Sequence, residues 1–338
     1  MVLSTQNPHD MDYHITFWNL ENLFDIENSP RRTDKLQRAI GSDISGWTQA
    51  VLDQKVQQLA SIIMQLNSGN GPDILGVCEI ENAHVMNLLI QALGALNRNY
   101  ALVHDDSNDR RGIDVAFIYD ADLFKVEEDN GEEKVFGHFV LRRTATRDIL
   151  QVNFLTKHSN EQQRLVLVAN HWPSRSGGQF ESNGYRQIAG ETLSYFHQRI
   201  REIHGDDTPV LAMGDFNDEP FNESLTRFAL SLRSRTKVVR GSNPYFLNLM
   251  WPLMEEGIGT FYFSNHPNML DQFLANENML KSNSTIKALT DSVTIDRFPE
   301  MVGTGTYPVP KHFGGMGKSV HQDGFSDHYP ISVKLRES

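Results

Sequence analysis

The chain reads Val210-Leu211-Ala212-Met213-Gly214-Asp215-Phe216-Asn217 at the point where an apolar run passes directly into polar side chains. Four successive apolar residues are typical of a strand that is buried on both faces. Polar groups at the end of such a strand are held rigidly and can face a cleft. Much later in the chain, Ser326-Asp327-His328 precedes a second apolar run, residues 329–333. Asp, Asn and His without Cys favour a hard-metal hydrolytic site over a structural zinc site.

Further strand-like runs recur along the chain, and helical patterns lie between them. We expect strands near residues 15–18, 74–78, 114–119, 165–169, 210–213, 269–274 and 331–335. Apolar residues at three- and four-residue steps predict helices over 51–66, 82–96 and 185–203, with Asn82 as a cap. The alternation of strands and helices predicts a layered α/β fold with central sheets between helices.

Two long segments match neither pattern. Residues 237–268 mix Asn, Pro, Gly and aromatic residues, and residues 281–326 are rich in Pro and Gly. We expect both to be long loops, which in compact domains are usually functional. The second leads directly into Ser326-Asp327-His328 and is therefore placed at the rim of the site.

The composition indicates a globular protein and limits its partners. The 338 residues are 39% hydrophobic and 22% charged, enough apolar residues for a full core. The formal net charge is −12. Because proteins that bind duplex nucleic acid usually have a basic surface, this charge argues against tight non-specific DNA binding. It does not exclude a nuclease, since a metal ion can neutralise phosphate locally.

Cysteine content and hydropathy bear on the compartment. Cys78 is the single cysteine and lies in an apolar run, so it reads as a small buried side chain and allows no intrachain disulfide. The polar N-terminus has no signal-peptide pattern, and no run reaches the ~18 apolar residues of a membrane span. We expect a cytoplasmic protein, with a secreted form whose signal peptide has been removed as the alternative.

Polar clusters stand at the ends of the expected strands. Hydrolysis of a phosphoester requires a hard cation, a base, donors for the phosphate oxygens and oriented histidines. Taken singly, an Asp or Asn after a strand is usually a turn residue. Together, five clusters supply all four requirements: Trp18-Asn19-Leu20-Glu21-Asn22, Glu79-Ile80-Glu81-Asn82, Asn170-His171-Trp172-Pro173-Ser174-Arg175, Gly214-Asp215-Phe216-Asn217, and Leu270-Asp271-Gln272 with Ser326-Asp327-His328.

In order and spacing, these clusters resemble the motif set of the endonuclease/exonuclease/phosphatase superfamily over residues 15–335. The resemblance implies a four-layer α/β sandwich, with two packed mixed β-sheets flanked by helices and a divalent-metal site at one edge. It also implies one domain over residues 13–337, after a flexible N-terminal lead-in of residues 1–12. The implied cofactor is Mg²⁺ or Mn²⁺.

The resemblance assigns roles to individual residues. Glu79 would be the principal metal ligand, Asn19 and Glu21 would complete or bridge the site, and Asp327 could approach the metal. Family members often have Asp where Glu21 stands, which leaves direct ligation by Glu21 in doubt.

The same resemblance supplies the catalytic groups. Asp215 would be the general base that deprotonates water, and Asn217 would align it and donate to a phosphate oxygen. His171 and His328 would bind the phosphoryl oxygens, with Asp271 orienting His328. The implied reaction is in-line attack of water at phosphorus, so we expect His328→Ala to be nearly inactive.

Weaker candidates for substrate contact are Arg111, Ser174 and Arg175, each with a solvated or turn residue as the alternative. The substrate stays open between nucleic acid, which we favour as the target of a nuclease, and a small phosphate ester or lipid headgroup. A non-catalytic binding relative is the remaining alternative. We expect a monomer, and the sequence identifies no protein partner.

Overall fold

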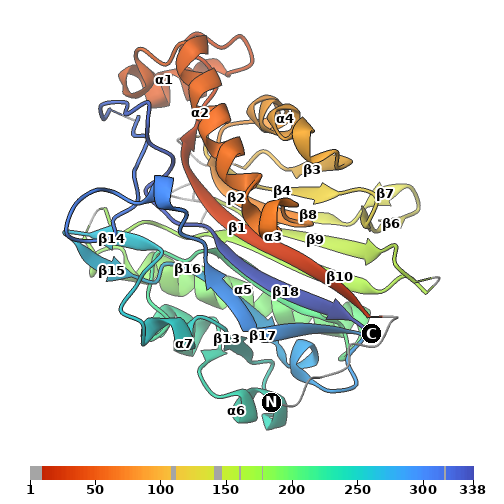
Figure 1. The fold of residues 1–338 in the computed structure, drawn as a ribbon. Helices are drawn as coiled ribbons and strands as arrows, with labels where there is room; N and C mark the ends of the chain where they lie inside the picture. The colour runs from red at the N-terminus through yellow and green to blue at the C-terminus, as the bar shows by residue number, and fades with distance from the viewer. Residues whose placement is uncertain (1–9, 108–111, 141–146, 160, 177, 316) are drawn as a thin grey trace.

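Two β-sheets pack face to face, and helices cover their outer faces (Figure 1). The computed structural model describes residues 10–107, 112–140, 147–159, 161–176, 178–315 and 317–338. The larger hydrophobic cluster fills the space between the sheets and continues under α2 (Gln49–Ile63) and α4 (Ala83–Ala92) on the first sheet. The smaller lies between the second sheet and helix α5 (Asn183–His204). The expected four-layer α/β sandwich with two mixed sheets is confirmed.

The first sheet has six strands, in the order β17-β18-β1-β2-β4-β3. At its centre β1 pairs parallel with β2 and antiparallel with β18, so that the sheet is mixed. The strands are β1 (Met11–Leu23), β2 (Ile74–Ile80), β3 (Tyr100–His104), β4 (Asp114–Asp120), β17 (Ile286–Ile295) and β18 (Ile331–Glu337).

The second sheet has the order β12-β13-β16-β11-β10-β9-β5, and β8 also pairs with β9. Here β10 and β11 are parallel, and β16 is antiparallel to β11. The strands are β5 (Phe124–Val126), β8 (Val135–His138), β9 (Ile149–Thr156), β10 (Arg164–His171), β11 (Val210–Asp215), β12 (Ser231–Leu232), β13 (Phe246–Asn248) and β16 (Asp271–Asn276). Two hairpins stand apart: β6 (Glu128–Asp129) with β7 (Glu132–Glu133), and β14 (Phe261–Phe263) with β15 (His266–Asn268).

The expected helices form. Asn82 caps α4, because its side chain accepts hydrogen bonds from the backbone N–H groups of His84 and Val85. In α2 the apolar positions Leu52, Val56 and Leu59 are buried, as the spacing predicts. The α-helices are α1 (Asp34–Ile40), α2 (Gln49–Ile63), α3 (Leu66–Gly69), α4 (Ala83–Ala92), α5 (Asn183–His204), α6 (Arg235–Arg240) and α7 (Trp251–Met254).

The interpretation of residues 237–268 and 281–326 as long loops is wrong in part. The first segment contains β13, α7 and the β14–β15 hairpin, and the second contains the ten-residue strand β17. Strand β17 lies at the edge of its sheet and alternates buried with more exposed residues, so it lacks the continuous apolar run of a central strand. The part of the second segment after residue 301 contains no helix or strand among its described residues.

Candidate active site

The strand-end clusters meet at one edge of the two sheets. His171, Asp215 and Asp271 lie opposite one another on the neighbouring strands β10, β11 and β16. Asn19, at the corresponding end of the first sheet, reaches across: its Nδ2 lies 3.2 Å from Asp215 Oδ2 and 3.4 Å from Glu79 Oε1. The expected constellation therefore converges, and Asn19 joins its two halves.

The backbone is bent where the site residues leave their strands. Glu79 has φ of 62° and Asn217 has φ of 52°, in the left-handed region that costs most non-glycine residues energy. The register of β2 against β4 shifts between Cys78 and Ile80, so that Glu79 occupies an irregularity in the ladder. This bend re-aims Glu79 from the sheet towards the edge, where its Oε2 accepts the Asn22 N–H at 3.1 Å.

Asp215 is buried and held by Asn217. The backbone N–H of Asn217 donates to Asp215 Oδ1 at 2.9 Å, and the Asn217 side-chain amide lies 3.2 Å from Oδ2. Burial raises the pKa of Asp215 to about 6, although the nearby His328 cation lowers it. A carboxylate with a pKa near neutrality can both hold and accept a proton at physiological pH.

His328 forms a short pair with Asp271. Its Nδ1 lies 2.6 Å from Asp271 Oδ2, and both side chains are buried. Burial alone lowers the pKa of His328, but the Asp271 carboxylate outweighs burial and raises it well above its usual value. His328 Nε2 lies 3.9 Å from Asp215 Oδ2. His328 is thus a cation that can donate from Nε2 into the same space that Asp215 faces.

His171 approaches the same carboxylates from β10. Its Nε2 lies 3.6 Å from Glu79 Oε1 and 3.8 Å from Asp215 Oδ2. Two imidazoles and two carboxylates therefore surround one small volume. Such a volume can accept a phosphoryl group between oriented donors.

Glu79 and Asp327 are the partly exposed carboxylates of the cluster. Their side chains are 18% and 33% exposed, whereas Asp215 and Asp271 are buried. Burial and the Glu21 carboxylate raise the pKa of Asp327 to about 7, and Glu79 adds to this effect. Crowded carboxylates that resist ionisation are stabilised by a bound cation. An all-oxygen donor set with room for water fits Mg²⁺ or Mn²⁺.

Glu21 is placed differently from these two residues. Its carboxylate accepts the backbone N–H groups of Phe313 at 2.6 Å and Gly314 at 3.1 Å, and it is buried. His312 Nδ1 lies 3.6 Å from the same carboxylate. Both oxygens of Glu21 already accept hydrogen bonds from the late loop, residues 302–326. Glu21 therefore anchors this loop beside the site and is a poorer metal ligand than Glu79.

The three weaker candidates for substrate contact differ in their surroundings. Arg111 lies outside the described residues. The Ser174 hydroxyl pairs with Ser176 Oγ at 2.7 Å. Arg175 donates to Asn217 O at 2.7 Å and to Asp218 Oδ1 at 3.0 Å, so its guanidinium supports the backbone after Asp215. This arrangement positions the backbone after Asp215, and the expected contact of Arg175 with substrate stays a prediction.

Sequence reasoning missed Lys55 and the backbone donors of the late loop. Lys55 of α2 is fully buried and donates to Phe325 O at 2.7 Å. Its position beside Val56 on the apolar face of α2 was the available signal. The N–H groups of Phe313 and Gly314 have no counterpart in side-chain patterns.

A second group of possible metal ligands lies at the neighbouring strand ends. His104, Asp106 and Asp114 bring ligand atoms within 4.8 Å of one another. However, Asp106 is 85% exposed, and Asp114 already pairs with His104 Nε2 at 3.1 Å and accepts from the Ser107 N–H at 3.1 Å. Asp114 is therefore satisfied without an ion, and the Glu79 cluster remains the better candidate.

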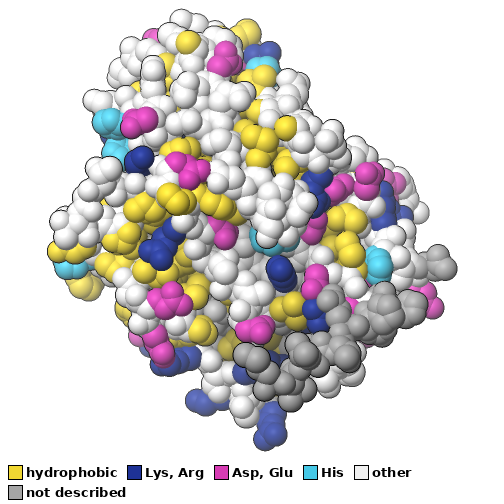
Figure 2. Space-filling model, viewed as in Figure 1, with side chains coloured by type: hydrophobic (Ala, Val, Ile, Leu, Met, Phe, Trp, Pro, Cys, Tyr) yellow, Lys and Arg dark blue, Asp and Glu magenta, His cyan; other side chains and the backbone are white. Residues whose placement is uncertain are grey.

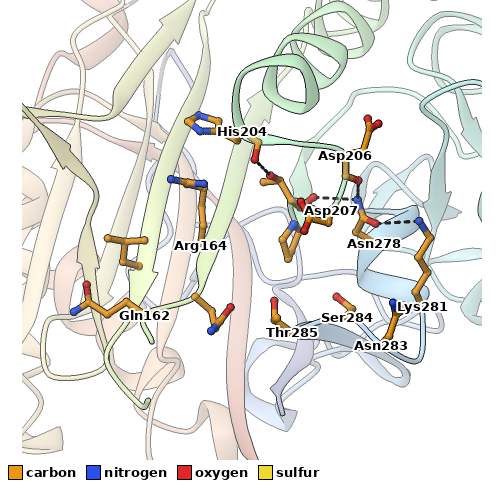
Figure 3. Close-up of a pocket in the computed structure, with 14 residues that line it drawn as sticks. Gln162, Arg164, His204, Asp206, Asp207, Asn278, Lys281, Asn283, Ser284 and Thr285 are labelled. Carbon is orange, nitrogen blue, oxygen red and sulfur yellow. Dashed lines mark hydrogen bonds between the residues drawn. The ribbon is translucent and has the colours of Figure 1, made fainter. Parts of the chain in front are cut away.

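A hollow of about 490 Å³ lies away from this constellation, at the opposite end of β10 and β11 (Figure 3). Arg164, Lys281, Asp206 and Asp207 line it together with neutral side chains. Arg164 is paired with Glu127, its Nε lying 2.8 Å from Oε2. The hollow brings no convergent acid, base and metal ligands together among the described residues, so its size does not mark the catalytic centre.

Known structures show the same fold. The chain aligns with D. rerio TDP2 humanized by 14 mutations at 15% identity and a TM-score of 0.57, over 96% of this chain and 98% of the other. It aligns with the sulfate-bound human Nocturnin catalytic domain at 14% identity and a TM-score of 0.52, over 98% of this chain and 100% of the other. It aligns with the Bacteroides thetaiotaomicron mannosyl-6-phosphatase Bt3783 at 15% identity and a TM-score of 0.51, over 96% of this chain and 99% of the other.

Sequence comparisons identify the family. No curated protein sequence matches the chain significantly. None of the described helices has the length and apolar character needed to cross a bilayer. A family model does match, over residues 14–337, and its description is the endonuclease/exonuclease/phosphatase family. The chain belongs to this family of phosphoester hydrolases, whose members are typically metal-dependent.

Proposed function

We propose that the protein is a Mg²⁺- or Mn²⁺-dependent nuclease that hydrolyses a phosphodiester by direct attack of water. One observation carries the proposal: Asp215, His171 and the Asp271–His328 pair converge beside the exposed carboxylate of Glu79. A base, two imidazole donors and a hard-cation ligand are the groups that phosphoester hydrolysis requires.

Asp215 accepts the proton of the attacking water. Its pKa of about 6 leaves it ionised at pH 7 yet close enough to neutrality to take up a proton in the transition state. Asn217 fixes its orientation through the 2.9 Å bond from the backbone N–H. Direct water attack suits these converging groups, because they pair a carboxylate base with oriented donors.

His328 and His171 bind the phosphoryl oxygens as negative charge develops. Because the Asp271 carboxylate raises the pKa of His328 well above its usual value, His328 acts as a charged donor near neutral pH. Glu79 and Asp327 would hold the cation, whose charge supplies electrostatic stabilisation of the phosphate oxygens. Asn19 keeps Glu79 and Asp215 in a fixed relation through its amide.

Exposed aromatic side chains support nucleic acid as the substrate. Phe180, Phe221, Phe263 and Tyr307 are 88%, 56%, 70% and 51% exposed. Each lies in a segment that adjoins a site strand: after β10, after β11, in the hairpin before β16, or in the late segment before β18. Exposed rings stack on nucleobases without sequence preference, which suits a single-stranded substrate.

A small phosphate ester is the second candidate, and the charge distribution favours it. The net charge is −12, and the described side chains on the face in Figure 2 show scattered acidic and basic groups rather than a continuous basic strip. A long nucleic acid would gain little from such a surface. The similar fold of a mannosyl-6-phosphatase is consistent with this alternative.

A substrate panel separates the two. Purified wild type and His328→Ala are assayed on labelled single-stranded DNA, RNA, supercoiled plasmid, a sugar phosphate and a choline phospholipid, each with Mg²⁺, Mn²⁺ or EDTA. We expect metal-dependent cleavage of single strands that His328→Ala lowers by about 100-fold or more. Activity confined to the sugar phosphate or the lipid would contradict the nuclease and support the second candidate.

A further inference from the structure

Lys55 is a buried cation immediately behind the candidate metal site. Its side chain is fully buried on the inner face of α2, between Leu52 and Leu59. Burying an ammonium group is costly unless it finds polar or charged partners. The Nζ donates to Phe325 O at 2.7 Å and lies 4.7 Å from the centre of the Phe313 ring.

Both contacts belong to the loop that leads into the site. This loop comprises residues 302–326; Phe313 lies near its middle, and its backbone N–H donates to Glu21. Phe325 stands near its end and is followed by Ser326, whose hydroxyl donates to Asn19 O at 2.6 Å. Lys55 therefore contacts the loop at Phe313 and Phe325. Glu21 holds the loop at the Phe313 N–H, and Asn19 holds it at the Ser326 hydroxyl.

Carboxylates dominate the electrostatic surroundings of Lys55. Burial lowers its pKa to about 8, and Glu21, Asp327 and Glu79 each act to raise it. Lys55 therefore stays mostly protonated at pH 7. Without a cation the three carboxylates would repel one another, and the positive charge that Lys55 carries near neutral pH reduces that repulsion.

We infer that Lys55 is a positioning residue that offsets the mutual repulsion of Glu21, Glu79 and Asp327 before the ion binds, with its ammonium group held between Phe313 and Phe325. The inference rests on the proposed function in taking Glu79 and Asp327 as metal ligands. It implies that the bound metal and Lys55 perform overlapping electrostatic work. Removing the charge of Lys55 therefore makes the fold depend more strongly on Mg²⁺.

Thermal unfolding in EDTA and in saturating Mg²⁺ tests this role. Lys55→Met removes the charge and the hydrogen bond, whereas Lys55→Gln keeps a donor near Phe325 O and removes only the charge. Leu59→Ala, in the core face of the same helix, is the matched control. We expect Mg²⁺ to raise the Tm of both Lys55 variants by more than it raises that of wild type. Leu59→Ala should lower the Tm by the same amount in EDTA and in Mg²⁺.

Isothermal titration with Mg²⁺ alone gives a second readout that is independent of activity. By linkage, a larger Mg²⁺-induced Tm shift corresponds to tighter binding, and removing one nearby positive charge should tighten it by about tenfold. Equal or smaller Mg²⁺-induced Tm shifts for Lys55→Met and Lys55→Gln, with unchanged or weaker Mg²⁺ affinity, would overturn the role of Lys55. A wild type that binds no Mg²⁺ would overturn the proposed metal site as well.

Discussion

Replacing Asp271 by asparagine tests whether His328 acts as a charged donor. The side chains meet at 2.6 Å, and Asp271 is fully buried, so solvent scarcely screens the pair. An asparagine at this position would be close in shape and could still accept a hydrogen bond from Nδ1. The substitution therefore removes the charge of Asp271 with little change in packing.

The magnitude follows from this geometry. Breaking a buried ion pair costs about 3–5 kcal/mol, and the retained hydrogen bond places Asp271→Asn near the lower end. That figure is a loss of folded-state stability; the effect on the rate comes from the weakened charged donor, whose loss typically lowers kcat by about 100-fold or more. The loss should appear in kcat more than in KM, because the phosphoryl charge that His328 meets develops in the transition state.

The assay is steady-state hydrolysis of the best substrate in saturating Mg²⁺, with Asp120→Asn as the control. Asp120 is also buried and lies 2.9 Å from Arg98, but it is at the opposite end of the first sheet. Asp120→Asn should lower the Tm and leave kcat unchanged. A folded Asp271→Asn with kcat within about threefold of wild type would refute the charged role of His328.

Three further outcomes are expected. Glu79→Gln should weaken Mg²⁺ binding by at least about 100-fold in isothermal titration, with an unchanged circular dichroism spectrum; wild-type affinity would remove Glu79 from the ligand set. In α5, Gly190→Ala should lower the Tm, because the added Cβ would lie 2.4 Å from Ser224 O. In Gly184→Ala the added Cβ meets nothing within 4 Å, so this variant should stabilise the helix by about 0.5–1 kcal/mol. Equal effects of the two substitutions in urea unfolding would contradict this packing. Burial lowers the pKa of His197 to about 3, so the fold favours its neutral form, and this group should contribute a loss of about 2 kcal/mol of stability between pH 7 and pH 5. His197→Gln should remove this contribution, exposed His266→Gln should keep it, and the same slope in both variants would refute the assignment.

The sequence predicted the central strands because they are buried on both faces. Strands β2 and β11 are almost entirely buried and appear in the sequence as unbroken apolar runs. The sequence did not predict strand β17, because this strand lies at the sheet edge and has only alternate residues buried. A pattern of this kind is short of apolar residues and resembles a polar loop.

The site could be predicted where chemistry resides in side chains at strand ends. Asn19, Glu79, His171 and Asp215 follow apolar runs, and the sheet edges bring them together. The supports of the site could not be predicted in the same way. The N–H groups that hold Glu21 belong to the backbone, which has no sequence signature for its direction.

Lys55 and Arg175 show a further limit of sequence patterns. A lysine or arginine is usually solvated or in contact with substrate, yet Lys55 is fully buried and Arg175 is occupied by Asn217 and Asp218. Only tertiary packing decides between these outcomes, because the acceptors come from distant segments.

In the proposed reaction, Asp215 deprotonates the water that attacks a phosphate group stabilised by the divalent cation. Its most direct test is one measurement, the initial rate of Mg²⁺-dependent phosphodiester hydrolysis by Asp215→Asn relative to wild type, at matched Mg²⁺ occupancy. We expect a fall in kcat of about 100-fold or more with retained folding and substrate binding. A folded Asp215→Asn that hydrolyses the substrate at close to the wild-type rate would contradict it.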